Sequence, residues 1–123
     1  MSLYVSGLNE VSAILDDVKK ANKSLDIQFL HDKSQKKSCL YLIYIITPLI
    51  SSISSIVNAV NDSNYFKEKT IFTYVLNENG KEFSSHQIKS LKATGKMIEL
   101  NGGKYFQEYS EFIKFIENIR VQN

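Results

Sequence analysis

The sequence predicts a three-layer α/β domain built on a mainly parallel sheet of four or five strands. Strand-like and helix-like segments alternate along the 123 residues, as they do where a crossover helix follows each strand. The segment Leu40–Ile46 is apolar throughout, which is typical of a central parallel strand covered on both faces. These two observations favour a flavodoxin-like sandwich, with helices on both faces of the sheet.

Three strands and one helix are expected before Thr47. The strands are Ser2–Ser6, Leu25–Leu30 and Leu40–Ile46. Asn9 is the expected N-cap of the helix, because its side-chain oxygen can accept a hydrogen bond from a first-turn amide. The apolar face of this helix would hold Val11, Ile14, Leu15 and Val18. The polar stretch His31–Ser38 is expected to form a loop.

A second helix is expected after Pro48, because apolar residues then recur at helical spacing. Its apolar face would hold Ile50, Ile53, Val57 and Val60. The opposite stripe would be solvated on periodicity alone, and it holds Ser51, Ser55, Asn58 and Asp62. The charged connection Tyr65–Lys69 then leads into a fourth strand, Thr70–Leu76.

The last part of the chain predicts two helices and a short edge strand. Asn77–Gly80 has the composition of a turn-rich loop. Ser84 and Gln87 have the spacing of a capping box, and Asn101–Gly103 predicts the end of the helix that starts there. The expected edge strand is Lys104–Gln107, and the final helix would have Ser110 as its cap and an apolar face of Phe112, Phe115, Ile116 and Ile119.

Composition and charge exclude several classes of protein. The chain has 15 basic and 13 acidic residues, whereas a dedicated nucleic-acid-binding domain usually has a denser basic surface. Its longest apolar run is far shorter than the roughly 20 residues of a membrane span. The single cysteine, Cys39, cannot form an internal disulfide, and we expect no signal peptide because Met1–Leu3 opens directly into a strand-like segment. We therefore expect one cytoplasmic domain over residues 1–123, without membrane contact or specific nucleic-acid binding.

The chain lacks the common cofactor and metal motifs. It has no GxGxxG or phosphate-loop lysine motif, no CxxC and no histidine pair at ligand spacing, so we expect no cofactor and no metal. His31 and His86 are isolated and are expected to be exposed. Cys39 is expected to be a small buried residue rather than a nucleophile. A solvated loop is expected to hold the basic cluster of Lys33, Lys36 and Lys37.

A series of short segments from Tyr44 onward matches one known family in the same order. These segments are YIITP (44–48), SSIVNAVNDS (54–63), KEKTIF (67–72), QIKSL (87–91), GKM (95–97), NGG (101–103) and YF (105–106). The series resembles the nucleoside 2-deoxyribosyltransferase-like family, especially the branch found in phages and prophages. The resemblance implies a flavodoxin-like fold, a nucleoside or nucleotide ligand, and the host cytoplasm as location if a phage encodes the chain.

Enzymes of that family cleave the bond between a nucleobase and deoxyribose through a glutamate that attacks the anomeric carbon. The resemblance places Asn58 at the position of this glutamate, and asparagine is a poor nucleophile. Asp62, one helical turn later, is the nearby carboxylate that could replace it. The candidate ligand-binding residues are Ser6, Gly7, Thr47, Pro48, Ser54, Asn58 and Asp62.

The first third of the chain departs from the family pattern, because only Ser6 and Gly7 remain of the glycine-rich turn and substrate loop. The loss of both nucleophile and loop favours a degenerate, non-catalytic relative that binds a nucleoside or nucleotide. Two alternatives stay open: an active transferase or N-glycosidase that uses Asp62, and a protein-interaction module. The resemblance also implies at least a homodimer, through the helix Leu49–Asp62 or an adjacent one.

Overall fold

The computed structural model describes residues 1–9, 11–29, 33–50 and 53–120, and its main feature is a five-stranded parallel sheet. The strand order is β2-β1-β3-β4-β7, with β3 in the middle. These strands are β1 (Ser2–Ser6), β2 (Asp26–Gln28), β3 (Tyr41–Ile46), β4 (Thr70–Tyr74) and β7 (Lys104–Phe106). The predicted parallel sheet and its central strand are confirmed.

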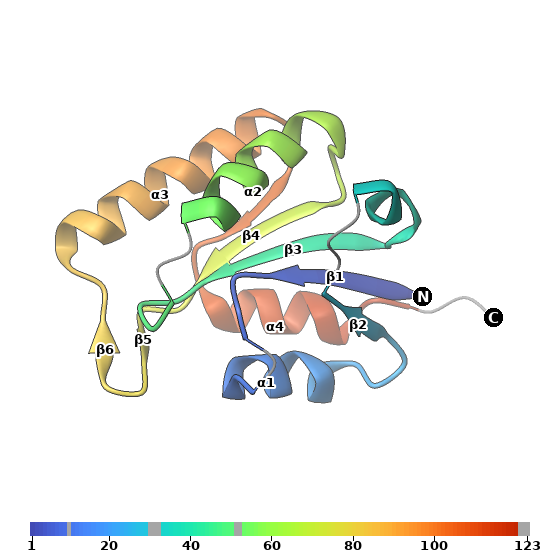
Figure 1. Ribbon diagram of the computed structural model, residues 1–123, viewed down its shortest axis with the longest axis horizontal. Helices are drawn as coiled ribbons and strands as arrows, with labels where there is room; N and C mark the ends of the chain where they lie inside the picture. The colour runs from blue at the N-terminus through green and yellow to red at the C-terminus, as the bar shows by residue number, and fades with distance from the viewer. Residues whose placement is uncertain (10, 30–32, 51–52, 121–123) are drawn as a thin grey trace.

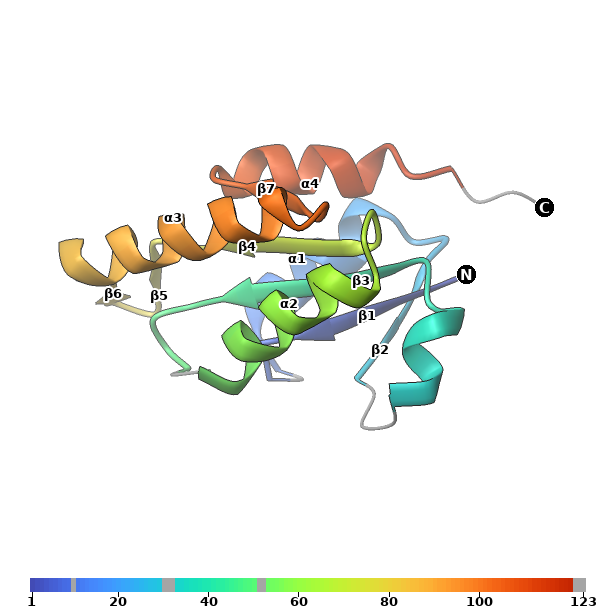
Figure 2. The same cartoon turned by 90° about the horizontal axis from the view of Figure 1, so that it is seen from above.

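Four α-helices cover this sheet among the described residues. They are α1 (Ala13–Ala21), α2 (Ile53–Tyr65), α3 (Ser85–Leu100) and α4 (Tyr109–Glu117). Figure 1 shows α2 and α3 on one face of the sheet and α1 and α4 on the other. Figure 2 shows α2 and α3 side by side over the strands. The predicted three-layer, flavodoxin-like sandwich is therefore confirmed.

The strands divide the core into two layers, because successive side chains point to opposite faces of the sheet. The layer under α1 and α4 is aliphatic on the strand side, with Leu3, Val5, Ile43, Ile45 and Ile71. The layer under α2 and α3 is mostly aromatic on the strand side, with Tyr4, Leu42, Tyr44, Ile46, Phe72 and Tyr74. The aromatic layer carries hydroxyl groups, and each buried hydroxyl needs a hydrogen-bond partner.

Helix α2 presents the opposite face to the sheet from the one predicted. Its buried residues are Ser55, Ala59, Asp62 and Ser63. Ile53 and Val57, which were predicted to face the core, are 71% and 60% exposed. Small side chains at Ser55, Ala59 and Ser63 leave room for the large rings of the sheet beneath them, since a close-packed interior pairs small residues with large ones. Helix α2 consequently exposes aliphatic residues and buries polar ones.

The predicted cap of α1 is wrong. The helix begins at Ala13, and Oγ of Ser12 accepts a hydrogen bond from the Ile14 amide at 3.2 Å. Oδ1 of Asn9 instead accepts a hydrogen bond from the Val11 amide at 3.1 Å, before the helix begins. Val11, which was predicted to be buried, precedes the helix and is 89% exposed.

The predicted boundaries of α3 are confirmed, whereas the predicted cap of α4 is wrong. Ser84 and Gln87 form both hydrogen bonds of a capping box. The chain leaves α3 through Gly102, whose φ of +105° favours glycine. Helix α4 begins at Tyr109 with Glu108 at the cap position, so Ser110 lies inside the first turn.

Two segments that were predicted as loops contain short regular elements. Residues Lys33–Ser38 form a 3₁₀ helix, η1, while His31 lies outside the described residues. The NENG segment turns a small antiparallel hairpin of β5 (Asn77–Glu78) and β6 (Lys81–Glu82). Asn79 and Gly80 at its tip have φ values of +50° and +80°, as in the two-residue turns that close most hairpins.

Candidate functional site

The hydroxyl groups of Ser6 and Thr47 lie where β1 and β3 end, and both are used inside the protein. Oγ of Ser6 and Oγ of Ser55 lie 2.7 Å apart and form a hydrogen bond that joins β1 to α2. Thr47 is 1% exposed, and its Oγ1 accepts hydrogen bonds from the amides of Leu49 and Ile50. Both hydroxyl groups therefore have hydrogen-bond partners within the protein, and these contacts give each of them a structural role.

Gly7, Pro48 and Ser54 have no shared contact that gathers them into a pocket among the described residues. Gly7 has a φ of +99°, and a Cβ atom at this position would overlap the carbonyl oxygen of Ile45. A glycine is therefore required by the close approach of β1 and β3. Pro48 is half-buried, and Ser54 is exposed on the first turn of α2.

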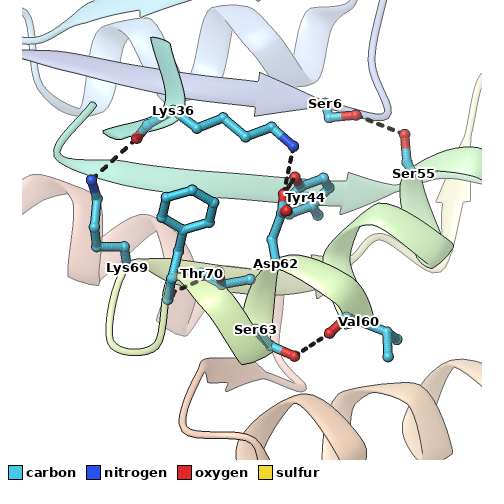
Figure 3. Close-up of polar contacts among 10 residues, drawn as sticks. Ser6, Lys36, Tyr44, Ser55, Val60, Asp62, Ser63, Lys69 and Thr70 are labelled. Carbon is cyan, nitrogen blue, oxygen red and sulfur yellow. Dashed lines mark hydrogen bonds and ion pairs between the residues drawn. The ribbon is translucent and has the colours of Figure 1, made fainter. Parts of the chain in front are cut away.

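Asp62 is the centre of a buried polar cluster toward the other end of α2. Nζ of Lys36 donates a hydrogen bond to Oδ2 of Asp62 at 2.8 Å, and the Tyr44 hydroxyl donates to the same oxygen. Figure 3 shows Lys36 and Tyr44 reaching this carboxylate from η1 and from β3. The Lys36 and Asp62 side chains are 10% and 5% exposed, so water screens this ion pair weakly.

The same cluster attaches η1 to the rest of the fold. Nζ of Lys69 donates hydrogen bonds to the carbonyl oxygens of Lys36 and Lys37, at 3.1 and 3.0 Å. The Lys36 ammonium also lies 5.5 Å from the centre of the Tyr4 ring, within the range of a cation–π contact. The prediction that Lys36 belongs to a solvated loop is therefore wrong, although Lys37 is exposed as expected.

Burial sets the protonation state of two groups near this cluster. Burial and the hydrogen bond to Asp62 raise the pKa of Tyr44 far above its usual value, because a tyrosinate would face a carboxylate. Tyr44 therefore remains a donor to Asp62. Burial also raises the pKa of the Cys39 thiol, although Lys69 acts in the opposite direction. A raised pKa and 2% exposure match the expectation that Cys39 is a small buried residue.

A surface groove of about 720 Å³ lies beside the Lys36–Asp62 pair. Its lining residues are Lys36, Lys37, Asn58, Asn61, Asp62, Tyr65 and Phe66. Asn58, Asn61 and Tyr65 are exposed along α2, whereas the ion pair is buried. The groove therefore brings together two of the predicted site residues, Asn58 and Asp62, and leaves the other five outside it.

Sequence reasoning missed Lys36, Tyr44, Asn61 and Tyr65 as residues of this region. One signal was available for Tyr44. A hydroxyl group inside a strand that is apolar on both sides needs a buried hydrogen-bond partner. The polar residues of the following helix were the nearest candidates, so Tyr44 could have indicated that Asp62 faces the sheet.

A second concavity, of about 660 Å³, lies where β4 and β7 end. This is the edge at which parallel α/β sheets usually bind ligands. Two carboxylates line this concavity and accept hydrogen bonds from neighbouring hydroxyl groups. Asp17 accepts from Tyr109 at 3.2 Å, and Glu78 accepts from Ser12 at 3.1 Å. None of the predicted site residues lines this concavity.

The described part of the chain contains no group of three or more His, Cys, Asp or Glu side chains placed to hold a metal ion. None of its helices is both long enough and apolar enough to cross a membrane. His86 is exposed, as expected for an isolated histidine. Comparisons with protein-family models, curated proteins and solved structures found no match to this chain.

Proposed function

We propose that this chain is a non-catalytic relative of the nucleoside 2-deoxyribosyltransferase-like family, of phage or prophage type, and that it binds a nucleoside or nucleotide. The observation that carries the proposal is the groove beside α2. It places Asn58 and Asp62 next to amide, ammonium and aromatic groups. The parallel, flavodoxin-like sheet is also the fold that the family resemblance implies.

The contacts of Asp62 support the non-catalytic part of the proposal. A nucleophilic carboxylate needs an oxygen that can approach the anomeric carbon of the sugar. Oδ2 of Asp62 instead holds the Lys36 ammonium and the Tyr44 hydroxyl, and both contacts stabilise the anion and reduce its reactivity. Asn58 is exposed on the groove but has no carboxylate.

The other lining groups suit the three parts of a nucleotide. The side-chain amides of Asn58 and Asn61 can each donate and accept hydrogen bonds, as the edge of a nucleobase requires. Tyr65 and Phe66 provide aromatic surface for the flat face of the base. Lys37 is exposed at the groove and can pair with a phosphate.

Deoxyribosyl transfer is expected to be at background level. Incubation of the chain with thymidine and free adenine should yield no deoxyadenosine by chromatography, because the Asp62 carboxylate that lines the groove holds the Lys36 ammonium and the Tyr44 hydroxyl. The variant Asn58→Glu restores a carboxylate at the family position, and any base exchange by it would show that the groove still orients a sugar. Turnover by the natural chain that is lost in a folded Asp62→Asn variant would instead make Asp62 the nucleophile and overturn the proposal.

Titration calorimetry with deoxynucleosides and their 5′-monophosphates tests the binding part. We expect a dissociation constant in the micromolar to millimolar range. This constant should increase when Asn58 and Asn61 are both replaced by alanine. Asp17→Asn is the matched control, because it changes the second concavity and leaves the groove intact. If the affinity falls in Asp17→Asn and not in the double asparagine variant, the binding site lies instead at the carboxyl ends of β4 and β7. No binding at all would favour the protein-interaction module.

We also propose that the chain forms a homodimer through α2. The exposed residues of α2 are Ile53, Ser54, Val57, Asn58, Asn61, Asn64 and Tyr65, and none of them is charged. In a two-fold contact each residue near the axis faces its own copy, so a charged residue there would meet a like charge. A helix face with aliphatic residues and no charge avoids this repulsion in a chain of which 23% is charged.

Light scattering at tens of micromolar is expected to give twice the mass of one chain. Val57→Lys should yield a monomer, because it places two like charges in the proposed contact. Leu100→Lys is the matched control, since Leu100 is 88% exposed but lies on α3. A monomeric natural chain would overturn the dimer proposal, as would equal effects of the two variants.

A further inference from the structure

We infer that the groove beside α2 binds a nucleotide in preference to the free nucleoside, and that the phosphate of the nucleotide lies against Lys37. The inference rests on the proposed function and specifies the ligand of the same groove. It is carried by the way in which charge is distributed along the groove, where a buried ion pair is neutral and one exposed ammonium group is left over.

The charged residues that line the groove are two lysines and one aspartate, namely Lys36, Lys37 and Asp62. The Lys36 ammonium lies 2.8 Å from the Asp62 carboxylate in a buried pair, so these two charges cancel at short range. Lys37 is exposed, and none of the ion pairs among the described residues includes it. A ligand that enters the groove therefore meets one net positive charge, carried by Lys37.

The buried pair allows a carboxylate to line a groove that accepts an anion. Oδ2 of Asp62 accepts hydrogen bonds from the Lys36 ammonium and the Tyr44 hydroxyl, and the Asp62 side chain is 5% exposed. An unpaired carboxylate at this position would repel a phosphate, because like charges at close range are unfavourable. Lys36 removes that repulsion, so the charge of Lys37 determines which ligands the groove attracts.

Lys69 holds Lys37 beside the aromatic wall of the groove. Its ammonium donates hydrogen bonds to the carbonyl oxygens of Lys36 and Lys37, and it lies 5.8 Å from the centre of the Phe66 ring. Figure 3 shows Lys69 reaching the backbone of η1 in this way. The backbone of Lys37 is therefore fixed before a ligand binds, which reduces the entropy lost on binding.

The α2 side of the groove contains no charge that would repel a phosphate. Its exposed residues are Asn58, Asn61 and Tyr65, which can contact the sugar and the base. The nucleoside part of the ligand then lies along α2, and the phosphate lies at η1, where Lys37 can pair with it.

Titration calorimetry with thymidine, thymidine 5′-monophosphate and inorganic phosphate tests this selection. At low salt we expect the monophosphate to bind about fivefold more tightly than thymidine, the effect of one well-placed exposed ion pair. The preference should shrink at high salt, because ions screen exposed charges. Equal affinities of thymidine and its monophosphate would overturn the inference and leave the proposed function intact. Failure of both to bind, or equally tight binding of inorganic phosphate, would overturn the proposed function itself.

Two variants connect the preference to Lys37. Lys37→Gln removes the charge of an exposed side chain and keeps the buried ion pair, so the fold should be retained. It should lower the affinity for the monophosphate to that for thymidine and leave thymidine binding unchanged. Lys89→Gln is the matched control, because it removes the same charge from an exposed residue of α3 outside the groove. A preference that persists in Lys37→Gln, or that falls equally in both variants, would contradict the inference.

Discussion

Replacement of Asp62 by alanine is expected to lower the free energy of unfolding by about 3–5 kcal/mol. The change leaves the Lys36 ammonium and the Tyr44 hydroxyl buried without their common acceptor. A single domain typically has about 5–15 kcal/mol of stability, so this loss would be a large fraction of the total. Urea denaturation followed by circular dichroism measures it as a shift of the midpoint.

The exposed ion pair of Lys114 and Glu111 provides the control for this prediction. Its charged groups lie 3.6 Å apart, and the side chains are 68% and 59% exposed. Lys114→Ala should change the stability by less than about 1 kcal/mol. The triple variant Lys36→Met, Tyr44→Phe and Asp62→Leu should recover most of the loss, because it removes both donors together with their acceptor and apolar residues can replace a buried ion pair. A similarly small effect of Asp62→Ala would show that the buried pair does not hold η1 to α2.

Gly7→Ala is expected to destabilise the fold by roughly 2–6 kcal/mol. About 1–3 kcal/mol comes from a side chain at positive φ, and about 1–3 kcal/mol comes from overpacking against the carbonyl oxygen of Ile45. To relieve the overlap, the ends of β1 and β3 would have to separate, and these are neighbours at the centre of the sheet. Thermal and urea unfolding of the purified variant measure the effect.

Gly80→Ala separates the two causes. Gly80 also has a positive φ, of +80°, but no atom lies within 4 Å of where its Cβ would be placed. This variant should lose only about 1 kcal/mol, the conformational part of the effect. Equal losses for the two glycines would mean that β1 and β3 can accommodate a methyl group, and that Gly7 is not required by strand packing.

The layers of the fold could be predicted from the sequence, because they depend on the period of the apolar pattern. Leu40–Ile46 could only be a central strand, and the capping box at Ser84 marked the start of α3. The orientation of α2 could not be predicted in the same way. The spacing of apolar residues correctly predicted that this segment is a helix. Which of its faces is buried was decided by the size of the rings on β1, β3 and β4.

The candidate site was harder to predict than the fold, because its residues come from separate segments. Lys36 and Asp62 are 26 positions apart, and a lysine in a polar stretch reads as solvated until the fold places it against a carboxylate. Asn58 was named from the family resemblance, and Asp62 was named because it lies one turn later on the same helix. The residues at the ends of β1 and β3 were named for a ligand, but their contacts are explained by the packing of the strands.

The two outermost strands of the sheet affect how the protein behaves at high concentration. β2 and β7 are each three residues long, and within the described part of the chain each pairs with one neighbour. Long open edges allow chains to add to one another and grow into fibrils, whereas edges this short offer few free backbone groups for such growth. Concentrated solutions should therefore remain clear and should not increase thioflavin fluorescence, since association can occur through helix side chains but is not propagated by the sheet.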